Sequence, residues 1–443
     1  MPYTKLRTSA LIGALSVSLL QASTAAAQVT VGNESDVQQV SLVDGPGVKV
    51  GEGTVLRPIV SAETGFVSNL FYESTDTTQV AALRIMAALS TGSASPSRTD
   101  AEASEGQAGE ESKGEAPSMI WSAGGRLTYT EFPFASTSAT MQRNLAADAN
   151  IRLVIKPEGT FRFEFSDHFA RVTNPTNFES RGQLNREANE LLTGVVYQPG
   201  GRAITAGLHY KNRVDVFENG DHDFANRVQH TAILSAGWQW LPITKFSFQG
   251  SFGFFGPLGT SAWKQESNPM QGRIGVATAI TEKMFGRASL GWAFSGYTFG
   301  EGYNTPVGDL ELGFRYAPTG RFTIAYSYDF QDSINANYFR DHALLAKLDH
   351  QFGKVMFRGI ADVRLRGYRG VPMSQLGGAS ASREDFLLGA TAVVGYLYRD
   401  WLSFDGRWKS MIDQTDFRYS SGTGNADPSF TRHEMFVGAT AAF

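Results

Sequence analysis

The sequence predicts an all-β fold, a transmembrane antiparallel β-barrel of about 18 strands. Three observations predict it: apolar and polar residues alternate with period two, short and long connections alternate along the chain, and an export signal stands at the start. The alternation is clearest over 246–254, where Phe246, Phe248 and Phe252 are separated by small or polar residues. Segments 232–240 and 322–330 repeat it. Each such strand is aromatic on one face and mostly small or polar on the other.

Composition excludes several classes of protein. The 443 residues include no cysteine, which excludes a disulfide scaffold and a zinc–thiolate site. With 43 acidic and 39 basic residues the net charge is −4, so we expect no nucleic-acid partner. A mean hydropathy of −0.20 is too polar for a bundle of membrane helices but suits barrel strands, which are only half apolar. No cofactor is expected.

The N-terminal segment is typical of a secretory signal. Lys5 and Arg7 precede an apolar run at 10–20 and a small-residue stretch that ends at Ala27. The apolar run is too short to span a bilayer core of about 30 Å. We therefore expect residues 1–27 to be a signal peptide cleaved before Gln28. The mature chain would be exported to the outer membrane of a Gram-negative bacterium.

Turns and loops divide the chain into strands. Short turns such as Lys156–Gly159 and Ala317–Gly320 recur, and longer polar connections such as 171–187 and 255–272 lie between them. Short turns that alternate with long loops are typical of outer-membrane barrels, in which the short turns are periplasmic and the long loops extracellular. The predicted strands are 56–72, 78–90, 118–133, 140–156, 160–170, 187–198, 202–216, 227–241, 245–255, 271–282, 285–299, 307–317, 321–331, 341–353, 355–369, 383–398, 402–416 and 432–443.

Two polar segments stand apart from the strands. Residues 28–54 are Gly-rich and are predicted to form a periplasmic N-terminal segment that precedes the barrel at 55–443. Within the barrel, 91–117 carries six acidic residues against Arg98 and Lys113 and no aromatic residue, which predicts a disordered acidic periplasmic insertion. This insertion either binds a periplasmic partner or is an inert linker.

The final strand ends in an aromatic residue. Met435, Val437 and Phe443 share one face of that strand, and the terminal phenylalanine resembles the signal that barrel-assembly machinery recognises. We expect this machinery, outer-membrane lipids and lipopolysaccharide as partners. A soluble secreted β-sandwich or propeller would need one very large core for so many aromatic faces. A closed barrel instead leaves no strand edge unpaired in lipid.

Charged residues occupy the face opposite the aromatics. A lysine or arginine that faces lipid at the bilayer midplane costs about 2–4 kcal/mol, so we expect these residues to point inward. A lumen enclosed by about 18 strands is too wide for side chains to fill and would hold water. Its mixed charges predict weak ion selectivity. The predicted pore-lining residues are Arg162, Glu164, Glu311, Arg315, Lys347, Asp349, Arg358, Asp362, Arg364, Arg366, Asp405, Arg407 and Lys409.

No catalytic or metal site is predicted. Ser166, Asp167 and His168 are the residue types of a hydrolase triad, but neighbours on a strand face opposite sides. The run 221–223, Asp-His-Asp, has metal-ligating residue types, but one turn supplies too few ligands. We therefore do not expect an enzyme.

One motif resembles a known family. The run 51–58, GEGTVLRP, leads into 65–72, GFVSNLFY. Gly65, Phe66, Asn69 and the pair at 70–71 resemble the first strand of an outer-membrane β-barrel family associated with exopolysaccharide export, the β-barrel porin 2 type with myxobacterial members. Val67 stands where that family has a polar residue. The resemblance implies a conduit for secretion of an exopolysaccharide or capsular polysaccharide, working with a periplasmic polysaccharide export protein.

Two other functions stay open from the sequence. One is a general diffusion porin for small hydrophilic solutes, in which the third extracellular loop, 171–187, would fold inward as a constriction. The other is a surface adhesin or structural anchor, which would place its function in the long outer loops. A nutrient transporter with an N-terminal plug is not expected, because 28–54 is too short for a plug domain.

Overall fold

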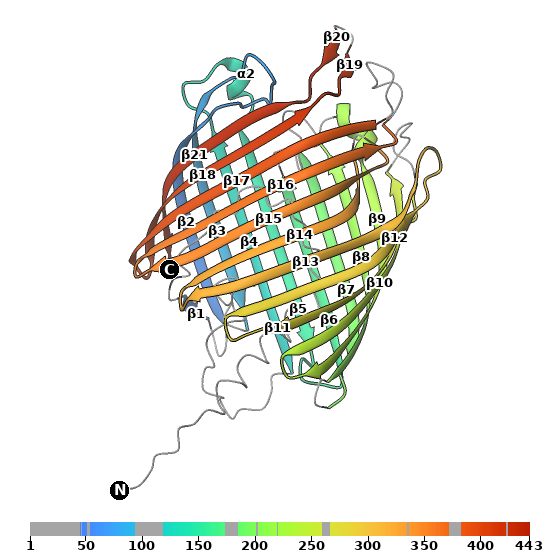
Figure 1. The fold of residues 1–443 in the computed structure, drawn as a ribbon. Helices are drawn as coiled ribbons and strands as arrows, with labels where there is room; N and C mark the ends of the chain where they lie inside the picture. The colour runs from blue at the N-terminus through green and yellow to red at the C-terminus, as the bar shows by residue number, and fades with distance from the viewer. Residues whose placement is uncertain are drawn as a thin grey trace.

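The fold is a single antiparallel sheet closed into a barrel (Figure 1). A computed structural model describes residues 45, 47–50, 54–93, 118–172, 185–200, 203–218, 220–258, 266–334, 336–371, 382–421 and 424–443. Strands β2 to β18 and β21 form the closed ring, each paired with its neighbours along the chain, and β1 adds a short pairing to β2. The predicted closed all-β barrel of 18 strands is thus confirmed.

The strands of this sheet succeed one another around the barrel in chain order. They are β1 Val48–Lys49, β2 Val55–Val67, β3 Val80–Gly92, β4 Met119–Glu131, β5 Asn144–Ile155, β6 Phe161–Val172, β7 Arg186–Tyr197, β8 Ile204–Phe217, β9 Arg227–Leu241, β10 Thr244–Pro257, β11 Met270–Ala279, β12 Met284–Ser295, β13 Tyr303–Ala317, β14 Gly320–Asp332, β15 Tyr338–Phe352, β16 Val355–Arg369, β17 Ser382–Arg399, β18 Leu402–Thr415 and β21 Phe430–Ala442. The connections contain α2 Thr137–Thr140, η1 Gly220–Ala225 and the hairpin β19 Tyr419–Ser421 with β20 Gly424–Ala426.

Every predicted strand overlaps one strand of the ring, with differences at the ends. Three connections contain structure that the alternation did not predict, one of them the short helix η1 between β8 and β9. Helix α2 lies between β4 and β5, where Ser136 caps it by accepting a hydrogen bond from the backbone N–H of Ala139. The hairpin β19–β20 lies between the predicted strands 402–416 and 432–443. Helix α2 and this hairpin lie at the same end of the barrel (top in Figure 1), the end that carries the long connections.

Some predicted segments lie outside the residues that the structure describes. They are the signal peptide, most of the segment 28–54, most of the acidic insertion 91–117 and most of the loop 171–187. Among the described residues, no helix is long and apolar enough to cross a membrane.

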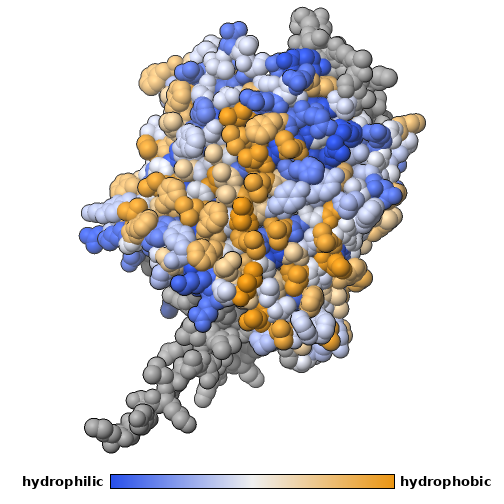
Figure 2. Space-filling view, viewed as in Figure 1, coloured by the Kyte–Doolittle hydropathy of each residue, from blue (hydrophilic) through white to orange (hydrophobic). Residues whose placement is uncertain are grey.

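The two faces of each strand differ in chemistry. On β6, Phe161, Phe163 and Phe165 expose between 37% and 54% of their surface, whereas Arg162 and Glu164 between them are half-buried and paired. Many large apolar side chains on other strands are exposed in the same way. Figure 2 shows hydrophobic residues spread over the middle of the visible wall. An exposed apolar surface of this extent requires an apolar solvent, because soluble monomers rarely show contiguous apolar patches above a few hundred Å².

The ring closes where the last strand meets the first. β21 pairs with β2 from Ile59↔Ala442 to Val67↔Glu434, and Figure 1 shows β21 beside β2 at this seam. Polar contacts add to the backbone ladder: the hydroxyl oxygens of Ser61 and Thr440 lie 3.1 Å apart. Closure leaves no row of backbone N–H and C=O groups open to lipid.

The motif at 65–72 has a structural role at this seam. The buried Asn69 side chain donates to the backbone oxygens of Glu73 (2.7 Å) and Thr431 (3.1 Å) and accepts from the Glu73 N–H (3.0 Å). The guanidinium of Arg432 donates to the backbone oxygen of Asn69 at 2.9 Å. Gly65 packs so closely on β21 that a Cβ would lie 2.1 Å from the carbonyl oxygen of Met435. The motif therefore ties the first hairpin to the last strand.

We predict that Gly65→Ala destabilises the barrel by about 1–3 kcal/mol, because the added methyl group forces β2 away from β21. Thermal or urea unfolding in detergent micelles, followed by circular dichroism, measures this change. Gly272→Ala is the matched control: no atom lies within 4 Å of a Cβ at that position. Equal stability of the two variants would contradict the proposed tight seam.

Candidate functional site

The charged residues lie on the inner face of the sheet. Arg227 of β9 forms an ion pair with Asp332 of β14 at 3.0 Å, and Arg273 of β11 pairs with Asp329 of β14 at 2.9 Å. These strands are not neighbours in the sheet. Only the concave side of a closed barrel brings side chains from such separated strands together. The alternation along each strand then assigns the other charged positions to the same side.

The predicted pore-lining residues form pairs of opposite charge along single strands. Arg162 lies 2.7 Å from Glu164 and Lys347 lies 3.2 Å from Asp349. These partners are two residues apart, the spacing that places both side chains on one face of a strand. Arg364 forms the same kind of pair with Asp362 at 2.8 Å.

Other predicted residues pair between strands. Arg358 donates to Asp349 at 2.6 Å, so this carboxylate has a cation on its own strand and another on β16. Arg287 donates to Glu311 at 3.1 Å, and Arg407 donates to Glu63 across the seam at 3.1 Å. Arg315, Asp405 and Lys409 are half-buried.

The sequence analysis missed several charged inner-face residues. Asp341 is one of them, and it pairs with the predicted Arg366 through two contacts of 2.7 Å. Arg383 lies between Asp385 and Asp413, also missed, at 2.5 Å and 3.4 Å. The period-two rule could have found Asp385, because it alternates with the apolar positions of β17. A second group surrounds Asp215, which is paired with three arginines: Arg186, Arg213 and Arg227.

Connections at the loop end pack against one another. Phe217 at the end of β8, Ala225 of η1 and Ile334 after β14 form one buried cluster, with Phe224 against it. A second buried cluster contains Ala336, Phe339, Tyr368 and Val371, with Phe417 against it. The Asn337 amide donates to the backbone oxygens of Phe299 and Glu301 at 3.0 and 3.2 Å. Connections that are far apart in sequence thus converge at this end of the barrel.

One stretch of the inner face stays more exposed. His168 of β6 keeps 52% of its side chain exposed while its Nε2 lies 2.8 Å from the Asp148 carboxylate. Glu190 of β7 keeps 39% exposed and pairs with Lys211 at 2.8 Å. Asn150 is also exposed. The wall from β4 to β8 therefore presents charges of both signs to water.

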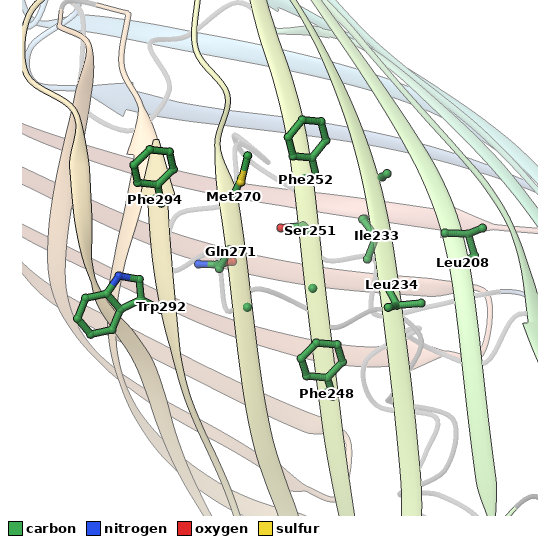
Figure 3. Close-up of a pocket in the computed structure, with 13 residues that line it drawn as sticks. Leu208, Ile233, Leu234, Phe248, Ser251, Phe252, Met270, Gln271, Trp292 and Phe294 are labelled. Atoms are coloured by element: carbon green, nitrogen blue, oxygen red, sulfur yellow. The ribbon is translucent and has the colours of Figure 1, made fainter. Parts of the chain in front are cut away.

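A depression on the wall from β8 to β12 is apolar instead. Figure 3 shows Phe248 and Phe252 on one strand, with Trp292 and Phe294 further along the wall. Gly272 adds to the depression because it has no side chain. The large side chains around it belong to the exposed apolar face, so this depression is separate from the charged inner face.

The side chains of Ser166, Asp167 and His168, considered above for catalysis, do not come together in one site. Ser166 and His168 share the inner face of β6, whereas Asp167 alternates onto the other face, and His168 bonds Asp148 instead. Among the residues described, no group of three or more histidine and acidic side chains could hold a metal ion.

Comparison with known proteins gives matches among solved structures. No protein-family model and no curated protein matches the chain. Among solved structures, OccK2 (OpdF) of Pseudomonas aeruginosa, in complex with glucuronate, is similar with a TM-score of 0.45 at 8% identity, over 88% of this chain and 98% of that one. OccAB4 of Acinetobacter baumannii gives 0.44 at 9% identity, over 88% and 98%. The siderophore receptor PirA of P. aeruginosa gives 0.39 at 8% identity, over 88% and 80%. Similarity at this level carries no conclusion about function.

The class of protein follows from the structure itself. A closed 18-stranded barrel with an exposed apolar outer face and a charged inner face is an outer-membrane β-barrel of the Gram-negative type. The predicted localisation and membrane lipid environment agree with it. The resemblance of the 65–72 motif to a polysaccharide-export family is not matched by a family assignment.

We predict that the buried inner-face pairs contribute far more to stability than exposed ones. Asp341→Asn removes the carboxylate that faces the buried Arg366, and we expect a loss of about 3–5 kcal/mol in the free energy of unfolding. Glu218→Gln removes the partner of Arg171 in a pair that stays about a quarter exposed, and we expect a loss of about 0–1 kcal/mol. Urea unfolding of both variants tests the contrast, and losses of equal size would refute it.

Proposed function

We propose that this barrel is a channel through which small hydrophilic solutes cross the outer membrane. The observation that carries the proposal is the charged, ion-paired inner face together with the converging connections at the loop end. A polar inner face suits hydrated solutes, because it replaces part of their hydration with hydrogen-bonding groups. Connections that pack together across the mouth limit the size of what passes.

The thirteen predicted inner-face residues are proposed to line this passage. Their pairing with opposite charges supports weak ion selectivity, since neighbouring charges of opposite sign largely cancel at a distance. The exposed wall around His168, Asp148 and Glu190 is the proposed place where solutes meet charged groups. The inward third extracellular loop of the porin hypothesis lies outside the described residues. The buried clusters around Phe217 and Ile334 and around Ala336 and Phe339 serve the constricting role in this proposal.

Polysaccharide export remains a prediction from the motif resemblance. The contacts of Gly65 and Asn69 account for the motif through the closure of the barrel, without reference to a transported polymer. The converging connections also favour small solutes over a long hydrated chain. For these reasons we favour the channel for small solutes, and we give neither the barrel-assembly machinery nor an export protein a role in it.

Liposome swelling with the purified barrel tests the proposal. We expect rapid entry of monosaccharides and small organic anions, and exclusion of dextran. Rapid passage of dextran would contradict the size limit and favour the export conduit. Absence of entry by every small solute would contradict the channel itself.

We predict that loosening the mouth enlarges the passage. Phe224→Ala combined with Ile334→Ala removes apolar contacts between the two connections, so single-channel conductance in planar bilayers should rise. Leu290→Ala is the control, because Leu290 is 72% exposed on the outer face of β12. Unchanged conductance in the double variant, with correct assembly, would show that these connections do not constrict the passage.

A further inference from the structure

A charged cluster lies on the outward face near the loop end of β15, β16 and β17. It consists of Arg340, Arg369 and Glu384. Arg340 shares strand parity with the exposed Leu344, and Glu384 shares it with the exposed Phe386. Arg369 shares parity with exposed Leu365 in the same way. The cluster therefore faces the lipid side of the barrel and not the lumen.

The two guanidinium groups converge on one oxygen. Nη2 of Arg369 lies 2.7 Å and Nη2 of Arg340 lies 3.5 Å from Oε1 of Glu384. Gly367 stands between them in register, paired with Arg340 on one side and Glu384 on the other. A Cβ there would come within 2.9 Å of the Arg340 guanidinium and 2.8 Å of the Glu384 carboxylate. Glycine thus leaves the space in which the three charged groups meet.

The cluster of Arg340, Arg369 and Glu384 carries a net positive charge. Two arginines face one carboxylate. The outward rim arginine on the opposite part of the barrel, Arg171, instead pairs with Glu218 and lies in register with a second acid, Glu187. A guanidinium has five N–H donors, and the contacts described engage one donor of Arg340 and two of Arg369. Arg340 is 39% and Glu384 60% exposed at the side chain, so an anion can reach the remaining donors.

An aromatic belt lies directly below the cluster. His342 is the next outward position of β15 after Arg340, and its Nδ1 lies 2.8 Å from the Tyr326 hydroxyl. Its ring also stacks on Tyr328 at 4.3 Å between centroids. Girdles of aromatic residues mark the membrane–water interface of such barrels. The cluster beyond the belt is therefore at the depth of lipid headgroups. Figure 2 shows a dense hydrophilic patch at the upper right, toward the end of the barrel where β16 ends and β17 begins.

We propose that Arg340 and Arg369 bind a phosphate group of lipopolysaccharide in the outer leaflet. The loop end of the barrel faces the cell exterior, where this phosphorylated glycolipid forms the leaflet. Arginine binds phosphate through paired, charge-assisted hydrogen bonds, and two converging guanidiniums present such donors together. The Glu384 carboxylate accepts hydrogen bonds from both arginines and so competes with the phosphate for their donors. This site is independent of the proposed channel function.

Native mass spectrometry of the full barrel in detergent tests the site with bisphosphorylated lipid A as the probe. We expect the Arg340→Gln/Arg369→Gln variant to bind this lipid about tenfold more weakly than the unsubstituted protein, a change of about 1.4 kcal/mol. Arg171→Gln, the matched rim control, should bind as the unsubstituted protein does. Heat-modifiable migration in gels verifies that each variant is assembled.

A second variant changes affinity in the opposite direction. Glu384→Gln removes the competing carboxylate charge, so binding of bisphosphorylated lipid A should strengthen, and this test holds even where the double variant fails to assemble. Three results would overturn the proposal: equal binding of dephosphorylated lipid A, unchanged or weaker binding by Glu384→Gln, and binding of inorganic phosphate without any preference for the lipid.

Discussion

Closure of the sheet is the constraint on which the rest of this structure depends. In hydrocarbon no water can pair with an open backbone N–H or C=O, and each unpaired group costs several kcal/mol. The pairing of β2 with β21 removes the open edges that a linear sheet of this length would leave. Side chains at the seam also help to close the barrel. Asn69 and Arg432 donate hydrogen bonds to backbone oxygens, and Gly65 allows β2 to approach β21 closely. The role of the segment 65–72, which resembles a family motif, is therefore first of all to hold β2 against β21.

Closure also creates an inside whose chemistry differs from the outside. The inner face carries arginines paired with acidic residues. Some partners lie two residues away or on an adjoining strand, as in Arg364–Asp362 and Arg366–Asp341, and others lie on strands further around the ring, as in Arg273–Asp329. Paired in this way, charges can stay buried without the cost of an isolated ion. The pairs stabilise the wall while leaving a polar surface. Toward the loop end, apolar residues such as Ile334 and Phe339 belong to buried clusters that pack segments from different strands against one another. On the outer face, by contrast, charged groups such as Arg340, Arg369 and Arg171 lie near the loop end of the barrel.

The sequence predicted the number and order of the strands because alternation is a local property with a fixed period. It placed Arg162 and Glu164 on one face for the same reason, and the structure shows that they pair. What it missed depends on distant residues. The partner of Arg366 lies on another strand, and the contact of Phe217 with Ile334 joins connections more than a hundred positions apart. No single-strand pattern contains that information. The sequence pattern could not show the role of Asn69 for the same reason, since one of its hydrogen-bond acceptors, the backbone oxygen of Thr431, lies 362 positions away.

The most direct test of this account compares two adjacent residues of β5. The chain has no cysteine, so single cysteines can be placed without background. Asn150 is exposed on the inner face, and Ile151 is 44% exposed on the outer face. In reconstituted vesicles, Asn150→Cys should react with a small charged thiol reagent in water. Ile151→Cys should resist it, and a fluorophore attached there before reconstitution should be quenched by brominated lipid. Lipid quenching at 150 with aqueous labelling at 151 would contradict a wet interior inside an apolar wall.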